Sequence, residues 1–542
     1  MLRLGARCVS RPLGRSVHTN PGLPRHSNRL VKVGLGTCAL SLVSLAGAAV
    51  YADALESSES TRAPLSTLLR SYFVYSVCSV PAFVNYSPTL LEACASIPGL
   101  KQTSEAIVRR TFFAQFVGGD TCEDALPLIA ELRRQNKGTL LAYSVEVDEK
   151  NSEGGAAQSK KNVDEMRASV DFAGDFEDVH GQKGPRKTWV AIKLSALVPA
   201  ADSLKRMSTF LLKGRPRDDV PYPGTPASFD LAVFEGPKET LLKGGLTEED
   251  IMSLRTLYDD LRRVCRRARE RGIRLIFDAE HTWYQPGIDA FVMALSREFN
   301  QPPRVQRSSL PDEQPLVYGT YQAYLKRTPA HLASSLRDAQ RHQYSLGVKL
   351  VRGAYRDKEI AHYANKSTES DCPVWPDKVA TDACYNSCAK TLVERLAESY
   401  GFSSAGWTTR SVTDKSSPDT RIGLLFGTHN NLSCAHILEC LVEFGLAYRG
   451  SDGKVMVKDG VEQRICFGQL YGMRDDLTNW VANSVRAKSP MVLKYVPYGA
   501  LADVMPYLSR RAIENQSVLG GEGGAKAERK MAGQEIKKRL FG

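Results

Sequence analysis

The first 52 residues of this 542-residue chain contain no aspartate or glutamate, whereas seven arginine and lysine residues fall among them. Of the net charge of +12, the rest of the chain therefore keeps only +5. That small excess forms no basic stripe, so the charge gives no support to nucleic-acid binding. Arginines at four-residue spacing, with interleaved serine and leucine and no carboxylates, are typical of a mitochondrial transit peptide. We expect one over residues 1–32, with a disordered basic tail as the alternative.

Charge is also missing from residues 33–52, a stretch of the length that spans a hydrocarbon core of about 30 Å. Its many glycine, alanine and serine residues make it only moderately hydrophobic. Two interpretations stay open, a single membrane anchor or a weakly apolar part of the import region. Gly34, Gly36 and Ala39 imitate a dinucleotide-binding fingerprint, but no strand precedes them and no βαβ unit follows, so we reject that match.

Motifs for metal binding and for nucleophilic serine chemistry are absent. The twelve cysteines form no CxxC pairs, and Cys384 and Cys388, four residues apart, have no second pair or histidine cluster beside them. Four residues are of ligand type, yet no HExxH occurs and no HxH follows a strand; they are Asp278, Glu280, His281 and His429. No GxSxG elbow is present. We therefore expect reduced, mostly buried thiols, no catalytic metal and no serine triad.

The body of the chain alternates apolar runs with amphipathic stretches, and its 42% hydrophobic and 24% charged content is that of a globular protein. Residues 61–137 have helical periodicity and are predicted to form an α-helical N-terminal region. Eight strand-like runs follow, apolar almost throughout, as parallel strands buried on both faces are. They predict a closed (β/α)8 TIM-like barrel in the α/β class rather than an open sheet. The runs are 138–147, 189–197, 273–280, 315–325, 346–355, 421–430, 464–473 and 492–499.

The barrel domain is predicted over residues 138–520, with two insertions. Residues 148–187 are polar, rich in glycine and lysine and without period, and residues 402–420 are rich in serine, threonine and aspartate. Both are expected to be surface loops or disordered. Residues 521–542, again rich in glycine and lysine, are predicted to form a flexible tail.

Polar and ionisable residues follow seven of the predicted strands, directly after apolar strand bodies. In (β/α)8 enzymes the reactive groups collect at these C-terminal strand ends. Polar residues at seven strand ends in succession are hard to explain as core packing, so they predict an active site at that end of the barrel. Its members are Lys193; Asp278, Glu280 and His281; Gln322 and Tyr324; Lys349, Arg352 and Tyr355; Thr428, His429 and Asn430; Gln469 and Tyr471; and Tyr495.

A candidate carboxylate clamp lies just after the eighth strand. On a helix, Tyr507, Arg510 and Arg511 share one face, and Glu514 is placed to pair with Arg510. Two adjacent guanidinium groups beside a tyrosine can bind a carboxylate in a bidentate manner. Helix statistics alone favour a solvated Arg-Arg-Glu face. The location at the mouth of the predicted barrel reverses that preference.

Four segments, KLVRGAYRDKE, GTHN, FGQLYGM and KYVPYGALADVMPYLSRRAIEN, resemble in order and spacing the signature of the proline dehydrogenase family. DAEHTWYQP and YQAYLK fall where the family has similar segments, and the resemblance covers roughly residues 100 to 520. The last segment is the most specific, because it joins Tyr495, Tyr507, Arg510, Arg511 and Glu514 in one register.

The resemblance implies a distorted (β/α)8 barrel that holds FAD without a Rossmann fingerprint and binds L-proline between the flavin and the final helix. Arg510 and Arg511 would grip the substrate carboxylate, with Glu514 beside them. Lys193, Asp278, Leu470, Tyr495 and Tyr507 would surround the ring. Lys193, Asp278, Tyr495 and the two arginines are thus the expected catalytic residues. The expected contacts of the flavin or its phosphates are Gln322, Lys349, Arg352, Gly353, Ala354, Thr428, His429 and Asn430, with Asp278 and Glu514 close to the flavin as well.

The implied reaction oxidises proline to Δ1-pyrroline-5-carboxylate and passes electrons to ubiquinone at the inner mitochondrial membrane, with no role for nucleic acid. Bacterial relatives tend to carry the cations at Lys349 and Arg352 in the opposite order, and Lys and Arg are not interchangeable donors. The bulky Tyr495 argues for proline over 4-hydroxyproline, whose hydroxyl needs room. A hydroxyproline dehydrogenase, and an inactive barrel serving as a scaffold or amino-acid sensor, are the competing hypotheses.

Overall fold

The computed structural model describes residues 64–80, 99–144, 155–181, 185–215, 219–302, 314–364, 372–401, 421–517 and 524–541. The chain divides into two compact units. The large one, residues 71–531, holds the barrel; the small one combines residues 1–70 and 532–542, described as helix over 65–70 and 532–541. The predicted transit peptide (1–32), the uncharged segment 33–52 and the predicted insertion 402–420 lie outside the described residues.

Helices precede the barrel, as predicted for residues 61–137. Val74, Tyr75, Phe113 and Phe116 pack with Leu508 of the last barrel helix in one buried cluster, which attaches this region to the barrel. Within the ranges that the structure describes, no helix is both long enough and apolar enough to cross a membrane. The elements are α2 (Leu65–Cys78), α4 (Leu100–Val108), a π-helical turn (Arg109–Phe113), α5 (Ala114–Phe116) and α6 (Leu126–Arg134).

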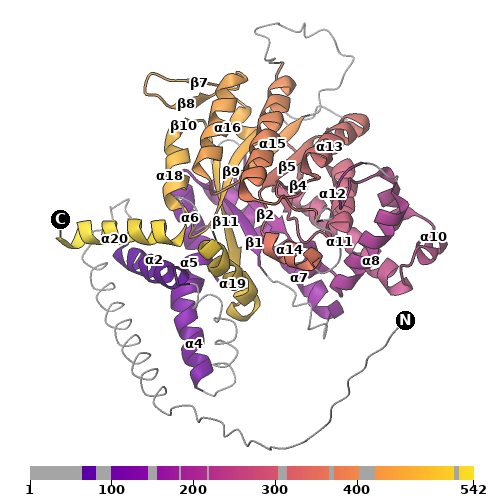
Figure 1. Ribbon diagram of the computed structural model, residues 1–542, viewed down its shortest axis with the longest axis horizontal. Coiled ribbons are helices and arrows are strands. Elements are labelled where there is room, and N and C mark those ends of the chain that lie inside the picture. The colour runs from indigo at the N-terminus through magenta and orange to yellow at the C-terminus, as the bar shows by residue number, and fades with distance from the viewer. Residues whose placement is uncertain are drawn as a thin grey trace, which may run out of the picture. The chain divides into compact units, whose positions relative to one another are not determined.

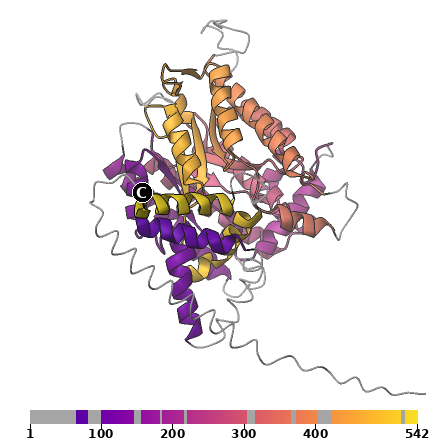
Figure 2. The ribbon, with the colours of Figure 1, turned by 60° about the vertical axis from the view of Figure 1, so that its left-hand side comes forward.

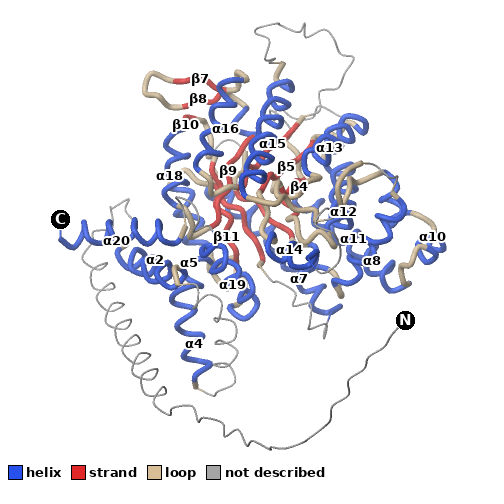
Figure 3. The backbone as a smooth tube through the Cα atoms, in the orientation of Figure 1, coloured by secondary structure: helices blue, strands red, loops and turns tan. Residues whose placement is uncertain are grey.

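Eight parallel strands close into a barrel in the order β1-β11-β9-β6-β5-β4-β3-β2. Each predicted run forms one of these strands, so the fold prediction is confirmed. Figure 3 shows the strands in the middle of the surrounding helices. Their bounds are β1 (Gly138–Tyr143), β2 (Thr188–Ile192), β3 (Leu275–Phe277), β4 (Val317–Gln322), β5 (Leu346–Val351), β6 (Ile422–Gly427), β9 (Ile465–Leu470) and β11 (Val492–Tyr498).

The helices between the strands cover the outside of the barrel (Figure 1). One of the longest, α11 (Glu248–Arg271), has clear signals at both ends. It begins with a capping box between Thr247 and Asp250 and is followed by Gly272 in the left-handed region. Neighbours α15 and α16 lie side by side, as Figures 1 and 2 both show. The helices are α7 (Gly155–His180), α8 (Ala201–Gly214), α9 (Ala232–Glu235), α10 (Lys238–Lys243), α11 (Glu248–Arg271), α12 (Gln285–Phe299), α13 (Thr328–His342), α14 (Arg356–Ala364), α15 (Lys378–Ser399), α16 (Asn431–Glu443), α17 (Val461–Arg464), α18 (Asp475–Ser484) and α19 (Leu501–Ser517).

The predicted insertion over residues 148–187 is wrong for residues 155–180, which form α7, the first helix of the barrel. Buried positions recur along α7 at helical spacing, but several are small or polar, such as Ser169, Ala173 and Gly174. Gly174 leaves room for Arg271, whose Nε would lie 2.2 Å from an added Cβ. The helix packs closely on α11 through Val163, Met166, Val170 and Phe176, an apolar stripe that small and polar buried neighbours dilute.

Further structure appears where none was predicted. Residues 525–541 of the predicted flexible tail form α20 (Ala525–Phe541). A small three-stranded sheet, order β10-β8-β7, is made of β7 (Ala447–Arg449), β8 (Val455–Val457) and β10 (Val485–Arg486). As expected, the nine cysteines among the described residues are free thiols, buried except for the half-buried Cys372.

Side chains that point into the barrel form one buried cluster, which includes Trp189, Ile276 and Leu493. Because side chains alternate along a strand, the residue two positions beyond an inward-facing one also faces inward. Lys193 follows Trp189 and Ala191 in this way. Four more predicted site residues have the same inward parity at the C-terminal ends of their strands, namely Asp278, Gln322, Leu470 and Tyr495. The fold therefore gathers them at one mouth of the barrel.

Candidate active site

A carboxylate at the end of β3 joins three strands at this mouth. Asp278 Oδ1 lies 2.5 Å from Lys349 Nζ, and Asp278 Oδ2 accepts a 2.9 Å hydrogen bond from the Tyr495 hydroxyl. The Lys349 ammonium lies 5.1 Å from the centre of the Tyr495 ring. The side chains of Lys349 and Asp278 are only 11% and 14% exposed, so water screens their attraction little. Burial and the nearby carboxylate raise the pKa of Tyr495 well above its usual value, which keeps the phenol protonated as a donor.

A second buried carboxylate fixes the neighbouring strand ends. Glu280 accepts hydrogen bonds from the backbone N–H of Ser195 at 2.9 Å and from its hydroxyl, just beyond the half-buried Lys193. The Gln322 amide donates to the Glu280 carbonyl at 2.9 Å. Burial raises the pKa of Glu280, although Lys193 and Ser195 oppose this. The ends of β2, β3 and β4 thus form one frame that carries Lys193, Asp278 and Gln322.

The predicted clamp lies on one face of α19. The guanidinium carbons of Arg510 and Arg511 lie 5.9 and 5.0 Å from the centre of the Tyr507 ring, so the three residues share a face as the spacing predicted. Arg510 also lies 5.3 Å from the ring of Tyr355, which follows β5. The sequence predicts that Glu514 can pair with Arg510, and the structure shows an ion pair between Glu514 and Arg511 at 2.5 Å. The Arg511 side chain is 4% exposed and that of Glu514 is 24% exposed, so Arg511 is the more deeply buried residue of this ion pair.

Arg352, expected with Lys349 at the flavin, lies on the other side of β5. Its position in the strand points it outward, toward α15 and α16. The guanidinium donates to Asp382 and Thr428 at 2.7 Å and to Ser433 at 2.8 Å, and it covers the Tyr385 ring at 4.4 Å. Arg352 thus joins the tops of two strands to two helices, whereas Lys349 faces the barrel interior.

The end of β6 brings His429 and Asn430 to the same region. Asn430 caps α16 by accepting a 3.0 Å hydrogen bond from the Ser433 N–H. His429 Nε2 accepts from the Leu470 N–H at 3.2 Å, so its proton is assigned to Nδ1. Nδ1 is buried without a hydrogen-bond partner among the described residues. Burial, and then Lys494 and nearby arginines, lower the pKa of His429 far below its usual value, so the imidazole is neutral.

The turn after β5 requires glycine. Gly353 has φ of 121°, and a Cβ there would lie 1.5 Å from Cδ1 of Tyr324. Tyr324 is buried and its N–H donates to the Arg352 carbonyl at 2.8 Å, which holds the ring over the glycine. Ala354 follows and is exposed. The backbone of this turn is therefore accessible beside a fixed aromatic ring.

Two residues at the site were missed from the sequence, Arg474 and Lys494. Lys494 is 1% exposed and donates to the Met473 carbonyl at 2.9 Å, and Arg474 donates to the His429 carbonyl at 3.1 Å. Lys494 interrupts an apolar strand. A lysine at such a position is seldom buried unless it is paired, so the interruption itself was the signal in the sequence. Arg474 lies one residue beyond the segment FGQLYGM, and its charge directly after this strand end was the signal in the sequence.

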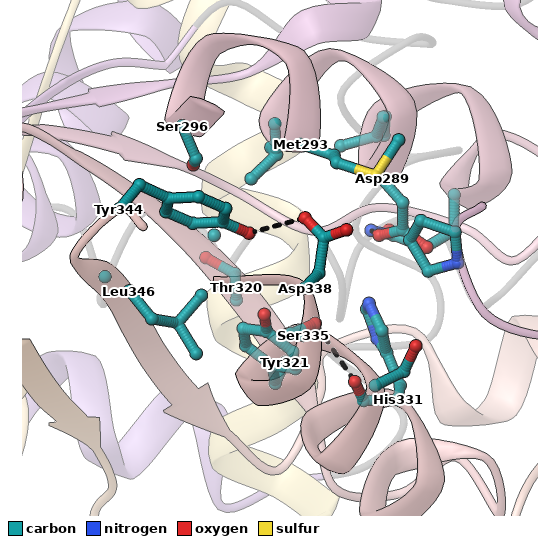
Figure 4. A pocket seen from close by; sticks show the side chains of 17 residues that line it. Asp289, Met293, Ser296, Thr320, Tyr321, His331, Ser335, Asp338, Tyr344 and Leu346 are labelled. Carbon is teal, nitrogen blue, oxygen red and sulfur yellow. Dashed lines mark hydrogen bonds between the residues drawn. The ribbon is translucent and has the colours of Figure 1, made fainter. Parts of the chain in front are cut away.

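A cavity of about 40 Å³ lies apart from this site, on the outer side of β4 and β5 and between α12 and α13. Figure 4 shows its lining, where the Tyr344 hydroxyl donates to Asp338 at 3.0 Å and His331 lies near Asp289. A space of this size has room for a few water molecules but not for a cofactor. The cavity is a packing defect of the helical layer and not part of the candidate active site.

His331 beside this cavity should make the protein sensitive to acid. Burial, with Arg327 nearby, lowers its pKa to about 3, so the folded state excludes a proton that the unfolded chain binds below about pH 6.5. Its contribution to stability is complete above that pH and is lost as the pH falls from about 6.5 toward 3. His331→Phe keeps a ring against Tyr321 but cannot titrate. Urea denaturation at pH 7 and pH 5 should show a smaller loss of stability for this variant than for the wild type.

Equal losses in the wild type and in His331→Phe would contradict the assignment.

Comparison with known proteins agrees with the fold and the motifs. The family model described as Proline dehydrogenase matches residues 125–521. Hydroxyproline dehydrogenase of Homo sapiens is 30% identical over 88% of this chain and 90% of that protein. Proline dehydrogenase 1, mitochondrial, of Dictyostelium discoideum is 26% identical over 88% of this chain and 73% of that protein.

Among solved structures, proline utilization A of Bdellovibrio bacteriovorus, inactivated by N-propargylglycine, aligns with a TM-score of 0.57 at 17% identity. The alignment covers 88% of this chain and 41% of that longer one, and at this identity it supports the barrel fold alone. The match of the family model over most of the chain, on a closed parallel barrel with its motifs at the strand ends, establishes the relationship. The chain belongs to the proline dehydrogenase family.

Proposed function

We propose that this protein oxidises L-proline to Δ1-pyrroline-5-carboxylate with FAD as the electron acceptor. The observation that carries the proposal is the position of Arg510 and Arg511 around Tyr507 on the helix that follows the eighth barrel strand. Two guanidinium groups beside an aromatic ring suit a small apolar ring that bears a carboxylate. Family membership supports proline oxidation, and the geometry supplies the groups that such a substrate needs.

The residues at the ends of β5 and β6 fit a flavin nucleotide. His429 Nδ1 is a buried donor with no partner in the described part of the chain, and it faces the barrel mouth by its strand parity. Gly353 leaves backbone accessible beside Tyr324, and the capped N-terminus of α16 at Asn430 offers the positive end of a helix dipole to phosphate. Bound FAD would supply two-electron redox chemistry. Lys349, Thr428 and Gln322 are the other residues proposed to hold it.

The remaining groups would bind, orient and enclose the substrate. Oxidation to the imine requires that C5 lose a hydride and that the ring nitrogen lose a proton, and a bound flavin would supply the two-electron acceptor. Arg510 and Arg511 would fix the carboxylate, and Tyr355, Leu470 and Tyr507 would cover the ring and exclude water. Asp278 keeps Tyr495 and Lys349 in place, and Lys193, just after β2, would border the same space. The chain thus contributes orientation and a dry site, while the cofactor performs the redox step.

A second candidate substrate is 4-hydroxyproline. It is favoured by the human relative named hydroxyproline dehydrogenase, which is aligned over 88% of this chain. Against it stands Tyr495, whose bulky ring is held by Asp278 and Lys349 and would leave less room for an added hydroxyl. We therefore expect L-proline to be the better substrate.

The test is to incubate the full-length protein with FAD, an artificial electron acceptor and either imino acid. L-Proline should be consumed faster, with a product lighter by two hydrogen atoms in mass spectrometry. Faster turnover of 4-hydroxyproline would reverse the assignment of substrate but keep the reaction class. Turnover of neither imino acid would contradict the proposed function.

For location, we propose the mitochondrion, with electrons passing to ubiquinone at the inner membrane. The support is the arginine-rich segment 1–32, which lacks carboxylates, together with the relative from Dictyostelium discoideum that is named mitochondrial. Fractionation of cells that express the full chain tests this, because the protein should appear with inner-membrane or matrix markers after removal of its first residues.

A further inference from the structure

The loop between β9 and α18 is tied to its surroundings by several hydrogen bonds. Lys494 donates to two of its carbonyls at 3.3 and 2.9 Å, and Tyr75 and Gln115 donate to the Gly472 carbonyl, Gln115 at 3.0 Å. Gly472 has φ of 71°, and a Cβ there would lie 1.8 Å from the Gln115 carbonyl oxygen. The loop carries Leu470 at its start, so its backbone determines where this proposed substrate contact lies.

Arg474 ends the loop and joins it to the end of β6. Its guanidinium donates to the His429 carbonyl at 3.1 Å, to Asn431 at 2.6 Å and to both oxygens of Asp476 at 3.0 Å. The side chain is 9% exposed, so these contacts form in a region with little water. Arg474 thus connects the loop of Leu470 with the histidine proposed to meet the cofactor.

Glu528, in the first turn of α20, holds Arg474 from the other side. Its Oε1 accepts a 3.1 Å hydrogen bond from the Arg474 N–H and lies 3.7 Å from the guanidinium Nε. Arg474 has φ of 49°, which is uncommon for a residue other than glycine and persists only when the surroundings fix it. The Glu528 side chain is 14% exposed. The carboxyl group therefore supports a backbone conformation that the chain would not adopt unaided.

The ionisation of Glu528 is consistent with this supporting role. Burial, followed by repulsion from Asp476 and Asp475, raises its pKa to about 7, although Arg474 opposes the shift. At neutral pH a large fraction of the carboxyl groups is then uncharged. Since its carbonyl oxygen still accepts the Arg474 N–H in that state, glutamine at this position should preserve the contact.

We propose that Glu528 is a positioning residue of the active site, which acts through Arg474 to fix the loop of Leu470 and the strand end of His429. The inference rests on the proposed function, because it assumes that these two residues meet substrate and cofactor. Glu528 lies beyond residue 521, where the match to the family model ends. The C-terminal helix of this chain therefore completes a site whose other members come from the family core.

The test compares Glu528→Ala, Glu528→Gln and the control Glu535→Ala, which removes a partly buried ion pair with Arg539 from the same helix. Flavin fluorescence during titration of the apoprotein gives Kd for FAD, and steady-state kinetics give KM and kcat for L-proline. Loss of this buried hydrogen bond predicts that Glu528→Ala raises Kd for FAD and KM by about tenfold, with kcat changed much less. Glu528→Gln and Glu535→Ala should remain close to the wild type.

A double-variant cycle separates action through Arg474 from a general loss of stability. If Glu528 acts through Arg474, then Glu528→Ala should add little to the effect of Arg474→Met on Kd for FAD. Full additivity, or wild-type Kd and KM in Glu528→Ala, would overturn the inference.

If Glu528→Ala does not fold, hydrogen exchange in the wild type gives the answer. Since coupling is reciprocal, FAD should slow exchange of the Arg474 amide, and unchanged exchange would contradict the inference. A wild type that binds no FAD and oxidises no proline would instead refute the proposed function.

Discussion

Arg511→Met should lower kcat/KM for L-proline by about a hundred- to a thousandfold, mainly through a higher KM. The Arg511 side chain is 4% exposed and paired with Glu514 at 2.5 Å. Removing one partner of a buried charge pair costs about 2–5 kcal/mol, and every 1.4 kcal/mol is about tenfold in affinity. Steady-state kinetics over a wide range of proline concentration measure the effect, and the content of FAD should not change.

Arg511→Met leaves the Glu514 carboxylate without its Arg511 partner, so a control must separate this effect from the loss of substrate binding. Arg511→Met/Glu514→Gln removes the stranded charge and should recover thermal stability without recovering KM. Ile513→Ser, at an exposed position of the same helix, should behave like the wild type. Recovery of KM in the double variant would show that Arg511 serves only to neutralise Glu514 and would argue against a carboxylate clamp.

Asp278→Asn should reduce both stability and turnover. It leaves the Lys349 ammonium, 11% exposed, without its carboxylate, and breaking a buried ion pair in this way costs about 3–5 kcal/mol. The Tyr495 hydroxyl also exchanges a charged acceptor for at most a neutral amide oxygen, so the ring is held less firmly at the mouth. Thermal denaturation should show a large fall in Tm, and kcat for L-proline should fall at least about tenfold.

A double variant separates the effect of Asp278→Asn on stability from its effect on turnover. Asp278→Asn/Lys349→Met replaces the stranded ammonium by an apolar side chain of similar length, which should restore most of the Tm. Turnover should stay low, because Tyr495 still has no carboxylate partner. A double variant with wild-type turnover would mean that the Asp278–Lys349–Tyr495 arrangement serves the fold alone.

The barrel could be predicted from the sequence because its strands are apolar on both faces and its site residues stand at strand ends. α7 was missed although Val163, Met166, Val170 and Phe176 recur at helical spacing, because polar and small residues around this stripe make the segment polar on average. The strands of the small sheet have two or three residues each, too few for a period to appear. The fold is thus predictable where an element is long enough to show a period and its buried positions carry large apolar side chains.

The site could be predicted at the level of strand ends but not of individual contacts. Lys349 and Arg352 are close in sequence, yet strand alternation sends one into the barrel and the other to α15 and α16. The sequence indicated Arg510 as the partner of Glu514 at i,i+4, and the structure adds an i,i+3 ion pair with the buried Arg511. The contact between Arg474 and Glu528 links a strand end to a predicted tail, and no local pattern indicates such a distant pair.

The most direct test of the proposed function is an anaerobic absorption spectrum of the full-length protein, purified with FAD and recorded before and after addition of L-proline. The account predicts an oxidised-flavin band that bleaches with L-proline and much more slowly with 4-hydroxyproline. A protein that remains colourless after incubation with FAD, or a flavin band that L-proline leaves unchanged, would contradict it.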